Sequence, residues 1–158
     1  MINQLLINLI LFLLTGVSLL VIGALILNEL PMNQPPGMLA RMRTYLTSNV
    51  AQTRRHHPFP ELELPVYQMA PAPLYSRIER AMEILGWEVV DAHPEEHRLH
   101  AVVETRLWRF RDDVEVKLIP GERGTEIHVR SASRVGKGDF GTNTRHILSL
   151  LQCLGRTV

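Results

Sequence analysis

The chain has 158 residues, of which 46% are hydrophobic, and its formal net charge is only +1. A charge this close to zero, with no basic run interleaved with aromatic residues, argues against nucleic-acid binding. The single cysteine, Cys153, cannot form an internal disulfide, and its apolar neighbours are typical of a core position.

The first part of the chain is an apolar stretch. Residues 5–27 carry no charge, and every Lys, Arg, Asp and Glu lies at position 29 or later. At ~1.5 Å per residue, a helix of this length matches a bilayer core of roughly 30 Å. A cleaved signal peptide is the less favoured alternative, because no basic residue precedes the stretch, the apolar run is longer than that of a signal peptide, and no small-x-small cleavage site follows it. We therefore expect residues 1–30 to form a single-pass anchor in the inner cell membrane, contacting lipid through residues 5–27.

Residues 31–63 have the composition of a juxtamembrane linker. Several prolines break any long helix, although residues 38–50 show apolar spacing that predicts one short helix lying on the membrane or on the domain. Arginines make this segment locally basic. The histidine pair His56 and His57 has no further ligand at suitable spacing, so we predict no metal site.

Residues 64–158 predict a small α+β domain. A short strand is expected at 66–69, a helix at 74–85, a strand at 87–91 and a turn at 92–97. Strands at 99–108, 114–118 and 127–131 alternate apolar and polar residues, and residues 142–154 form an amphipathic helix. These patterns predict an antiparallel sheet of about four to five strands, with two helices covering its apolar face.

Residues 130–143 form a corner that joins a strand to the last helix. Its three glycines permit a sharp turn, and Asp139, Thr142 and Asn143 are suited to cap the helix. Basic residues around a helix start can bind an anion, whereas a tight, capped connection with solvated cations is the alternative. The candidate binding residues are Arg130, Ser131, Arg134, Lys137, Asp139, Asn143 and Arg145.

Three motifs carry a family resemblance. They are residues 110–114 (Phe-Arg-Asp-Asp-Val), residues 129–134 (Val-Arg-Ser-Ala-Ser-Arg), and Gly136, Asp139, Gly141, Asn143 and Ile147 at their observed spacing. In this order they resemble the bacterial and plastid family called domain of unknown function 1499, over roughly residues 60–154. The resemblance implies a small α+β domain, often tethered by N-terminal helices and commonly held outside the cytoplasm, without an assigned activity. His146 departs from it, because similar sequences carry arginine there, a charge that Arg145 can supply.

The side of the membrane is indicated by two opposing signals. Arg41 and Arg43 follow the apolar stretch, which favours a cytoplasmic domain. The family resemblance favours the outside. Because two arginines are a small bias, we expect an extracytoplasmic domain.

The sequence predicts a non-catalytic, membrane-anchored accessory module. It lacks a nucleophile beside a base at motif spacing, a phosphate-binding loop and a zinc-binding HExxH motif, and we expect no cofactor. The hypothesis is that the 130–143 corner docks a membrane-protein partner or an acidic ligand. A small anionic ligand or a lipid headgroup, and less readily an enzyme of unknown reaction, are the alternatives.

Overall fold

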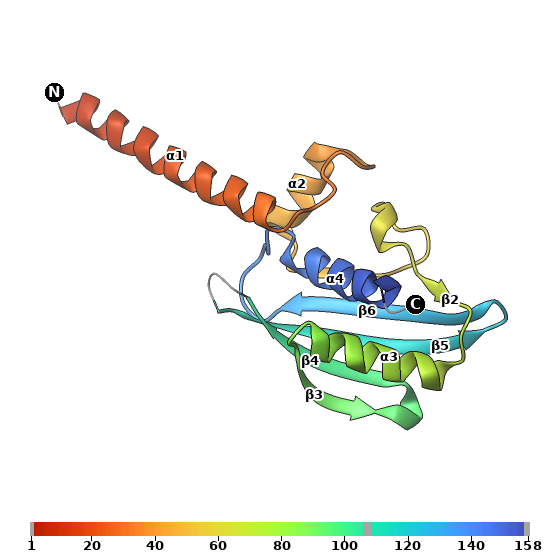
Figure 1. The fold of residues 1–158 in the computed structure, drawn as a ribbon. Helices are drawn as coiled ribbons and strands as arrows, with labels where there is room; N and C mark the ends of the chain where they lie inside the picture. Colours follow the sequence, from red (N-terminus) through yellow and green to blue (C-terminus); the bar gives the residue numbers. More distant parts are fainter. Residues whose placement is uncertain (1, 106–108, 157–158) are drawn as a thin grey trace.

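The computed structural model describes residues 2–105 and 109–156 (Figure 1). In chain order the elements are α1 (Ile2–Leu27), α2 (Met38–Thr47), β1 (Val50–Gln52), the 3-10 turn η1 (Pro60–Leu62), β2 (Val66–Tyr67), α3 (Pro71–Ile84), β3 (Glu88–His93), the 3-10 turn η2 (Pro94–Glu96), β4 (Arg98–Glu104), β5 (Arg111–Gly121), β6 (Gly124–Ser133) and α4 (Thr142–Arg156). The α+β fold and its apolar N-terminal helix are as predicted from the sequence.

The six strands form one antiparallel sheet in the order β1-β6-β5-β4-β3, with β2 also paired to β6. The sheet has more strands than expected because β1 and β2 share the outer edge of β6. Val50 of β1 faces Ala132 near one end of β6, and Val66 of β2 faces Glu126 near the other. Strands of two or three residues are too short to show an alternation of side chains, so β1 was not predicted.

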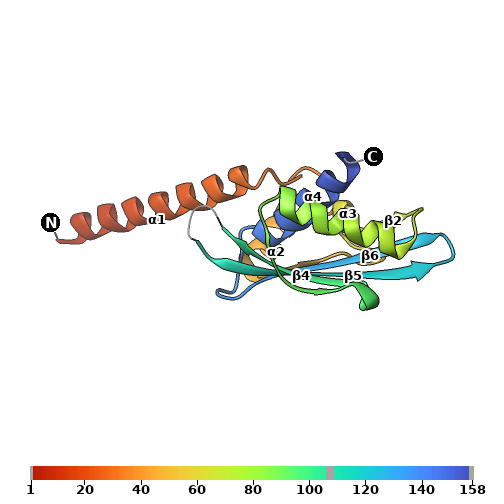
Figure 2. The same cartoon turned by 60° about the horizontal axis from the view of Figure 1, so that its bottom comes forward.

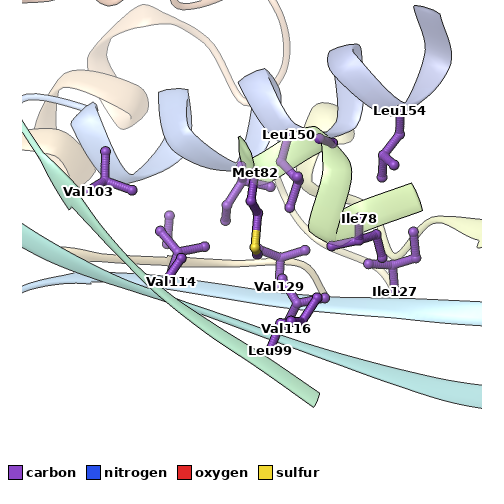
Figure 3. Close-up of a cluster of buried hydrophobic side chains, with 14 of the residues drawn as sticks. Ile78, Met82, Leu99, Val103, Val114, Val116, Ile127, Val129, Leu150 and Leu154 are labelled. Atoms are coloured by element: carbon purple, nitrogen blue, oxygen red, sulfur yellow. The ribbon is translucent and has the colours of Figure 1, made fainter. Parts of the chain in front are cut away.

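Helices α3 and α4 lie side by side on one face of the sheet, and the other face is left open (Figure 2). The inward residues of the strands are the apolar members of the predicted alternation, and they pack against the helices. Figure 3 shows this core, which includes Ile78, Met82, Leu99, Val114, Val116, Ile127, Val129, Leu150 and Leu154. The expected strand at 99–108 ends at Glu104 as β4, and residues 106–108 lie outside the described residues.

The helix expected at 74–85 starts earlier, at Pro71. Pro71 and Pro73 lie in its first turn, where a missing backbone N–H removes no intrahelical hydrogen bond. Prolines that look like breakers in the sequence are therefore compatible with the helix start.

Helix α1 projects away from the domain (Figure 1). Its segment Asn3–Leu27 is long and apolar enough to cross a membrane, and most of its large apolar side chains are exposed. Only its C-terminal end meets the domain, where Leu25 packs against the core and Leu30 is buried just beyond the helix.

The segment 31–63 contributes α2, β1 and η1 to the same sheet and core as residues 64–158. Arg41 of α2 is fully buried and forms a two-pronged ion pair with Glu61 of η1, with N–O distances of 2.5 and 2.9 Å. Its guanidinium also lies 4.5 Å from the centre of the Phe59 ring. The composition of this stretch predicts a linker. Local sequence does not show that Arg41 and Glu61, which are 20 residues apart in the chain, meet in the fold.

Candidate functional site

The 130–143 corner leaves β6 and enters α4 through three residues of positive φ, Gly136 at 96°, Phe140 at 53° and Gly141 at 83°. Asp139 caps α4 as the sequence predicts. Its Oδ1 accepts the backbone N–H of Gly141 and its Oδ2 that of Asn143, both at 2.9 Å. Burial raises the pKa of Asp139, and these two hydrogen bonds oppose the rise in part.

The corner rests on α2 and on the end of α1. The backbone N–H groups of Asp139 and Phe140 both donate to the carbonyl oxygen of Tyr45, at 3.2 and 3.0 Å. The side-chain amide of Asn28 donates to the carbonyl of Phe140 at 2.9 Å and to the hydroxyl of Thr142 at 3.3 Å. Thr142 thus contacts Asn28, just after α1, instead of capping the helix. The corner is therefore the joint between the N-terminal helix and the domain.

Asn143 is fully buried and uses its amide entirely within the fold. Its Nδ2 donates to the carbonyl of Asn49 at 2.8 Å and to the hydroxyl of Ser133 at 2.9 Å. Its Oδ1 accepts the hydroxyl of Ser131 at 2.6 Å, and Ser131 is also fully buried. These two candidate binding residues are inaccessible to a ligand and hold β1, β6 and α4 together.

Arg134 is neutralised by a partner on the open face of the sheet. Its Nε and one terminal nitrogen donate to the two oxygens of Asp113 at 2.8 and 2.7 Å. This charge-assisted pair is the main reason that the pKa of Asp113 falls to about 2, and His100, at 2.9 Å from the same carboxylate, adds to the effect.

The remaining three candidate cations differ in their surroundings. Arg145 lies 3.0 Å from Glu29 at the end of α1, and Arg130 lies 3.7 Å from Glu115. Lys137 is exposed and has no ion pair within the described part of the chain. The structure therefore places all seven predicted residues near one end of the domain, but most of them bind each other or neighbouring elements.

A buried polar cluster lies beneath α4 and could not be recognised in the sequence. Asp112 is 1% exposed, and within the described ranges neither of its carboxylate oxygens has a hydrogen-bond partner. His146 Nδ1 is 3.7 Å from Asp112 Oδ2 and 3.3 Å from the hydroxyl of Ser131. The residue types are those of a Ser-His-Asp triad, but a triad uses both ring nitrogens and an accessible serine. In this cluster Asp112 and Ser131 both face Nδ1 of His146, and Ser131 is buried.

Burial controls the ionisation of this cluster. It lowers the pKa of His146 from 6.5 to about 4. It raises the pKa of Asp112, opposed in part by the nearby hydroxyl of Ser133. Both shifts favour the neutral form of the side chain, so the cluster carries less charge than its composition suggests.

We expect His146 to make the protein less stable in mild acid. In the unfolded chain His146 binds a proton below its ordinary pKa of 6.5, whereas in the folded protein it binds one only near pH 4. The contribution of His146 to stability is therefore full above pH 6.5 and is lost as the pH falls towards 4. From pH 7 to pH 5 the loss should be about 2 kcal/mol. Urea unfolding would compare Asp112→Asn with Asp112→Asn/His146→Gln.

The comparison is made in the Asp112→Asn background because Asp112 changes the pH dependence of stability in the opposite direction to His146. Its raised pKa contributes stability that is present at low pH and lost as pH rises through the folded value. All other titrating groups are shared by the two variants and cancel in the difference. Equal pH slopes for the single and double variants would show that His146 titrates normally in the fold.

The open face of the sheet carries a row of basic side chains. Arg98, Lys117 and His128 occupy directly opposed positions on β4, β5 and β6. Arg98 and Lys117 carry like charges, which repel in opposed positions at a cost of up to ~1 kcal/mol. Arg98 is 3.4 Å from the exposed Glu96 and His128 is 3.1 Å from Glu126, whereas Lys117 has no ion pair in the described ranges.

A shallow hollow follows this row. It is lined by Gln52, Thr53, Arg98, Glu115, Val116, Lys117, His128, Val129 and Arg130. Arg98, Lys117 and His128 come from three strands whose pairing only the sheet register reveals, and each of these three is separated from the next by ten or more residues in the chain. The alternation in the sequence predicts that Lys117 and His128 lie on the polar face, but it does not show which residues of the other strands they oppose.

No cluster of three or more His, Cys, Asp or Glu side chains in the described ranges could hold a metal ion. The model of the family described as protein of unknown function, DUF1499, matches residues 34–154. The chain belongs to the DUF1499 family. The match includes α2 and β1 as well as the corner, so the DUF1499 unit begins before residue 64. No curated protein matches the chain.

Proposed function

We propose that this DUF1499 protein is a single-pass membrane-anchored, non-catalytic accessory module. It binds an acidic patch on a membrane-protein partner through the open face of its sheet. The observation that carries the proposal is the row of Arg98, Lys117 and His128, which the fold holds in directly opposed positions and in which Lys117 has no ion pair within the described ranges.

The membrane anchor is α1, because an exposed apolar helix of this length needs a lipid environment. A removable signal segment fits the structure less well. The end of α1 contributes Leu25 to the packing, and the residues just after it, Asn28 and Glu29, bind Phe140 and Arg145. We place the domain on the extracytoplasmic side, in keeping with the resemblance to tethered family members.

A partner bearing carboxylates would relieve repulsion within the row. The exposed Arg98 and Lys117 can reach outward from the sheet, and Arg130 continues the basic surface towards the corner, where Lys137 is also exposed. Complementary charge of this kind steers association and selects the partner. A small anion bound in the same hollow is the second candidate, favoured by the convergence of Arg98, Lys117 and His128 on one depression.

The buried cluster supports a non-catalytic role. Ser131 and Asp112 are almost completely enclosed, so a substrate cannot reach the only described serine that touches a histidine ring. Nucleophilic catalysis requires an accessible nucleophile beside its base.

Charge reversal on the open face tests the proposal. We expect Lys117→Glu and Arg98→Glu to reduce recovery of the partner at least tenfold when the full chain is isolated in mild detergent after cross-linking in membranes, because attraction becomes repulsion. Arg80→Glu is the matched control, since Arg80 is exposed on α3, on the opposite side of the sheet. Recovery of the partner with Lys137→Glu tests separately whether the corner takes part in binding.

Equal recovery with Lys117→Glu and Arg80→Glu would count against the open face. Loss only with Lys137→Glu would move the contact to the corner. To separate a small ligand from a protein partner, inorganic phosphate would be titrated into the labelled full-length chain. Chemical-shift changes confined to the row, without any cross-linked protein, would favour the small anion.

A further inference from the structure

We infer that the anchored end of the domain rests on the phospholipid bilayer, with apolar side chains of α2 and of the corner inserted among the lipid headgroups. The inference rests on the proposed membrane span of α1, but not on docking by the open face. It assigns a lipid-contact surface to residues outside the span, namely Met38, Leu39, Arg43, Leu46, Val135, Lys137 and Phe140.

Internal contacts fix the rotation of α2. Arg41 and Tyr45, one helical turn apart, are 0% and 2% exposed and face the domain. Arg41 also donates to the carbonyls of Gln34 and Pro35, at 3.0 and 2.6 Å. With this side held inward, Leu39, Arg43 and Leu46 lie on the opposite side of the helix at i, i+4 and i+7 spacing.

The outward side of α2 is apolar and uncovered. Leu39 is 84% exposed and Leu46 42%, and Met38, which lies in the first turn on the side of Tyr45, is also 52% exposed. The corner adds Val135 at 67% and Phe140 at 36%. Single exposed apolar side chains are ordinary on a protein surface, but a group of them gathered at one end marks an interaction site.

This group lies where the span leaves the membrane. Figures 1 and 2 both show α2 beside the C-terminal end of α1. The hydrogen bonds from the corner to Tyr45 and from Asn28 to Phe140 join α1, α2 and the corner into one unit. If the charge-free part of α1 fills the bilayer core, its last residues reach the headgroups. Helix α2 and the corner are then held at the same level.

The charges in this group suit the headgroup region. Helix α2 contains no acidic residue, and its only outward charge is Arg43. Lys137 of the corner is likewise exposed. Basic side chains beside apolar ones are typical of segments that lie in the membrane interface, where the cations meet lipid phosphates.

Depth-dependent fluorescence quenching tests the inference. Single cysteines would replace Leu39, Leu14 and Ile84 in the full chain carrying Cys153→Ala, each labelled with an NBD fluorophore. The proteins would be reconstituted into phosphatidylcholine and phosphatidylglycerol vesicles containing brominated phosphatidylcholine. Leu14 reports on the span, and Ile84 of α3 is the control because both are 59% exposed.

We expect the label at position 39 to be quenched at least threefold more than the label at 84, and somewhat less than the label at 14. Strong quenching at 14 with equal, weak quenching at 39 and 84 would overturn the inference while leaving the anchor intact. Weak quenching at all three positions would overturn the span, and the lipid-contact surface with it.

Discussion

Gly141→Val should lower the melting temperature of the full chain by roughly 10 °C or more, because valine is strained at this position. The φ of Gly141 is +83°, a region that β-branched residues avoid at a cost of ~1–3 kcal/mol. A side chain there would also overlap Leu30 and crowd Tyr45, both of which are buried. Overpacking of this kind costs a further ~1–3 kcal/mol. Thermal unfolding in detergent, followed by circular dichroism, would measure the change.

Gly155→Val is the matched control. Gly155 lies in α4 without positive φ, and a side chain built on it meets nothing within 4 Å. Valine and glycine differ little in helix propensity, so we expect this variant to melt within a few degrees of the unmodified chain. A Gly141→Val protein that melts like Gly155→Val would mean that the corner tolerates a side chain and does not pack tightly against Leu30.

Arg41→Ala should destabilise the domain by about 3–5 kcal/mol, the usual cost of removing one partner from a buried ion pair. The substitution leaves the Glu61 carboxylate, which is only 15% exposed, without its two-pronged partner. It also removes the donors to the carbonyls of Gln34 and Pro35. Urea unfolding of the full chain would report the loss.

Two further variants distinguish the buried pair from a general effect of charge on α2. Arg43→Ala removes an exposed arginine two residues away and should change the free energy of unfolding by no more than about 0.5 kcal/mol. Arg41→Leu/Glu61→Leu removes both charges and should recover much of the stability lost in Arg41→Ala. If Arg41→Ala and Arg43→Ala were equally mild, residues 34–61 would be attached more loosely than the contacts indicate.

The long strands could be predicted from the sequence because alternation over many residues reports directly on a half-buried sheet. In β5, Val114, Val116 and Leu118 face the helices while Glu115 and Lys117 face outward. The same reasoning cannot detect β1, since three residues show no period. It also cannot predict that Arg41 is buried, because local composition does not show that Phe59 and Glu61 will fold back onto α2.

In the corner, too, some side-chain roles can be predicted from local sequence and others depend on residues that are distant in the chain. Capping by Asp139 follows from its position before the helix, and this prediction is confirmed. The roles of Asn143 and Arg134 depend on partners at Asn49 and Asp113, which only the tertiary fold brings close. A basic residue near a helix start is therefore a weak predictor of binding until its possible intramolecular partners are known.

The hydrogen bonds that join residues 28–49 to the corner link parts of the chain that are synthesised at different times. Asn49 and Asn143 are 94 residues apart, and Asn28 and Phe140 are 112 apart. At ~5–20 residues per second, the ribosome needs roughly 5–20 s to supply the later partner after the earlier one has emerged. Helices α1 and α2 and strand β1 are therefore complete well before the corner that joins them to α4 has been synthesised. The contacts between the first-synthesised part of the domain and the corner are therefore among the last to form.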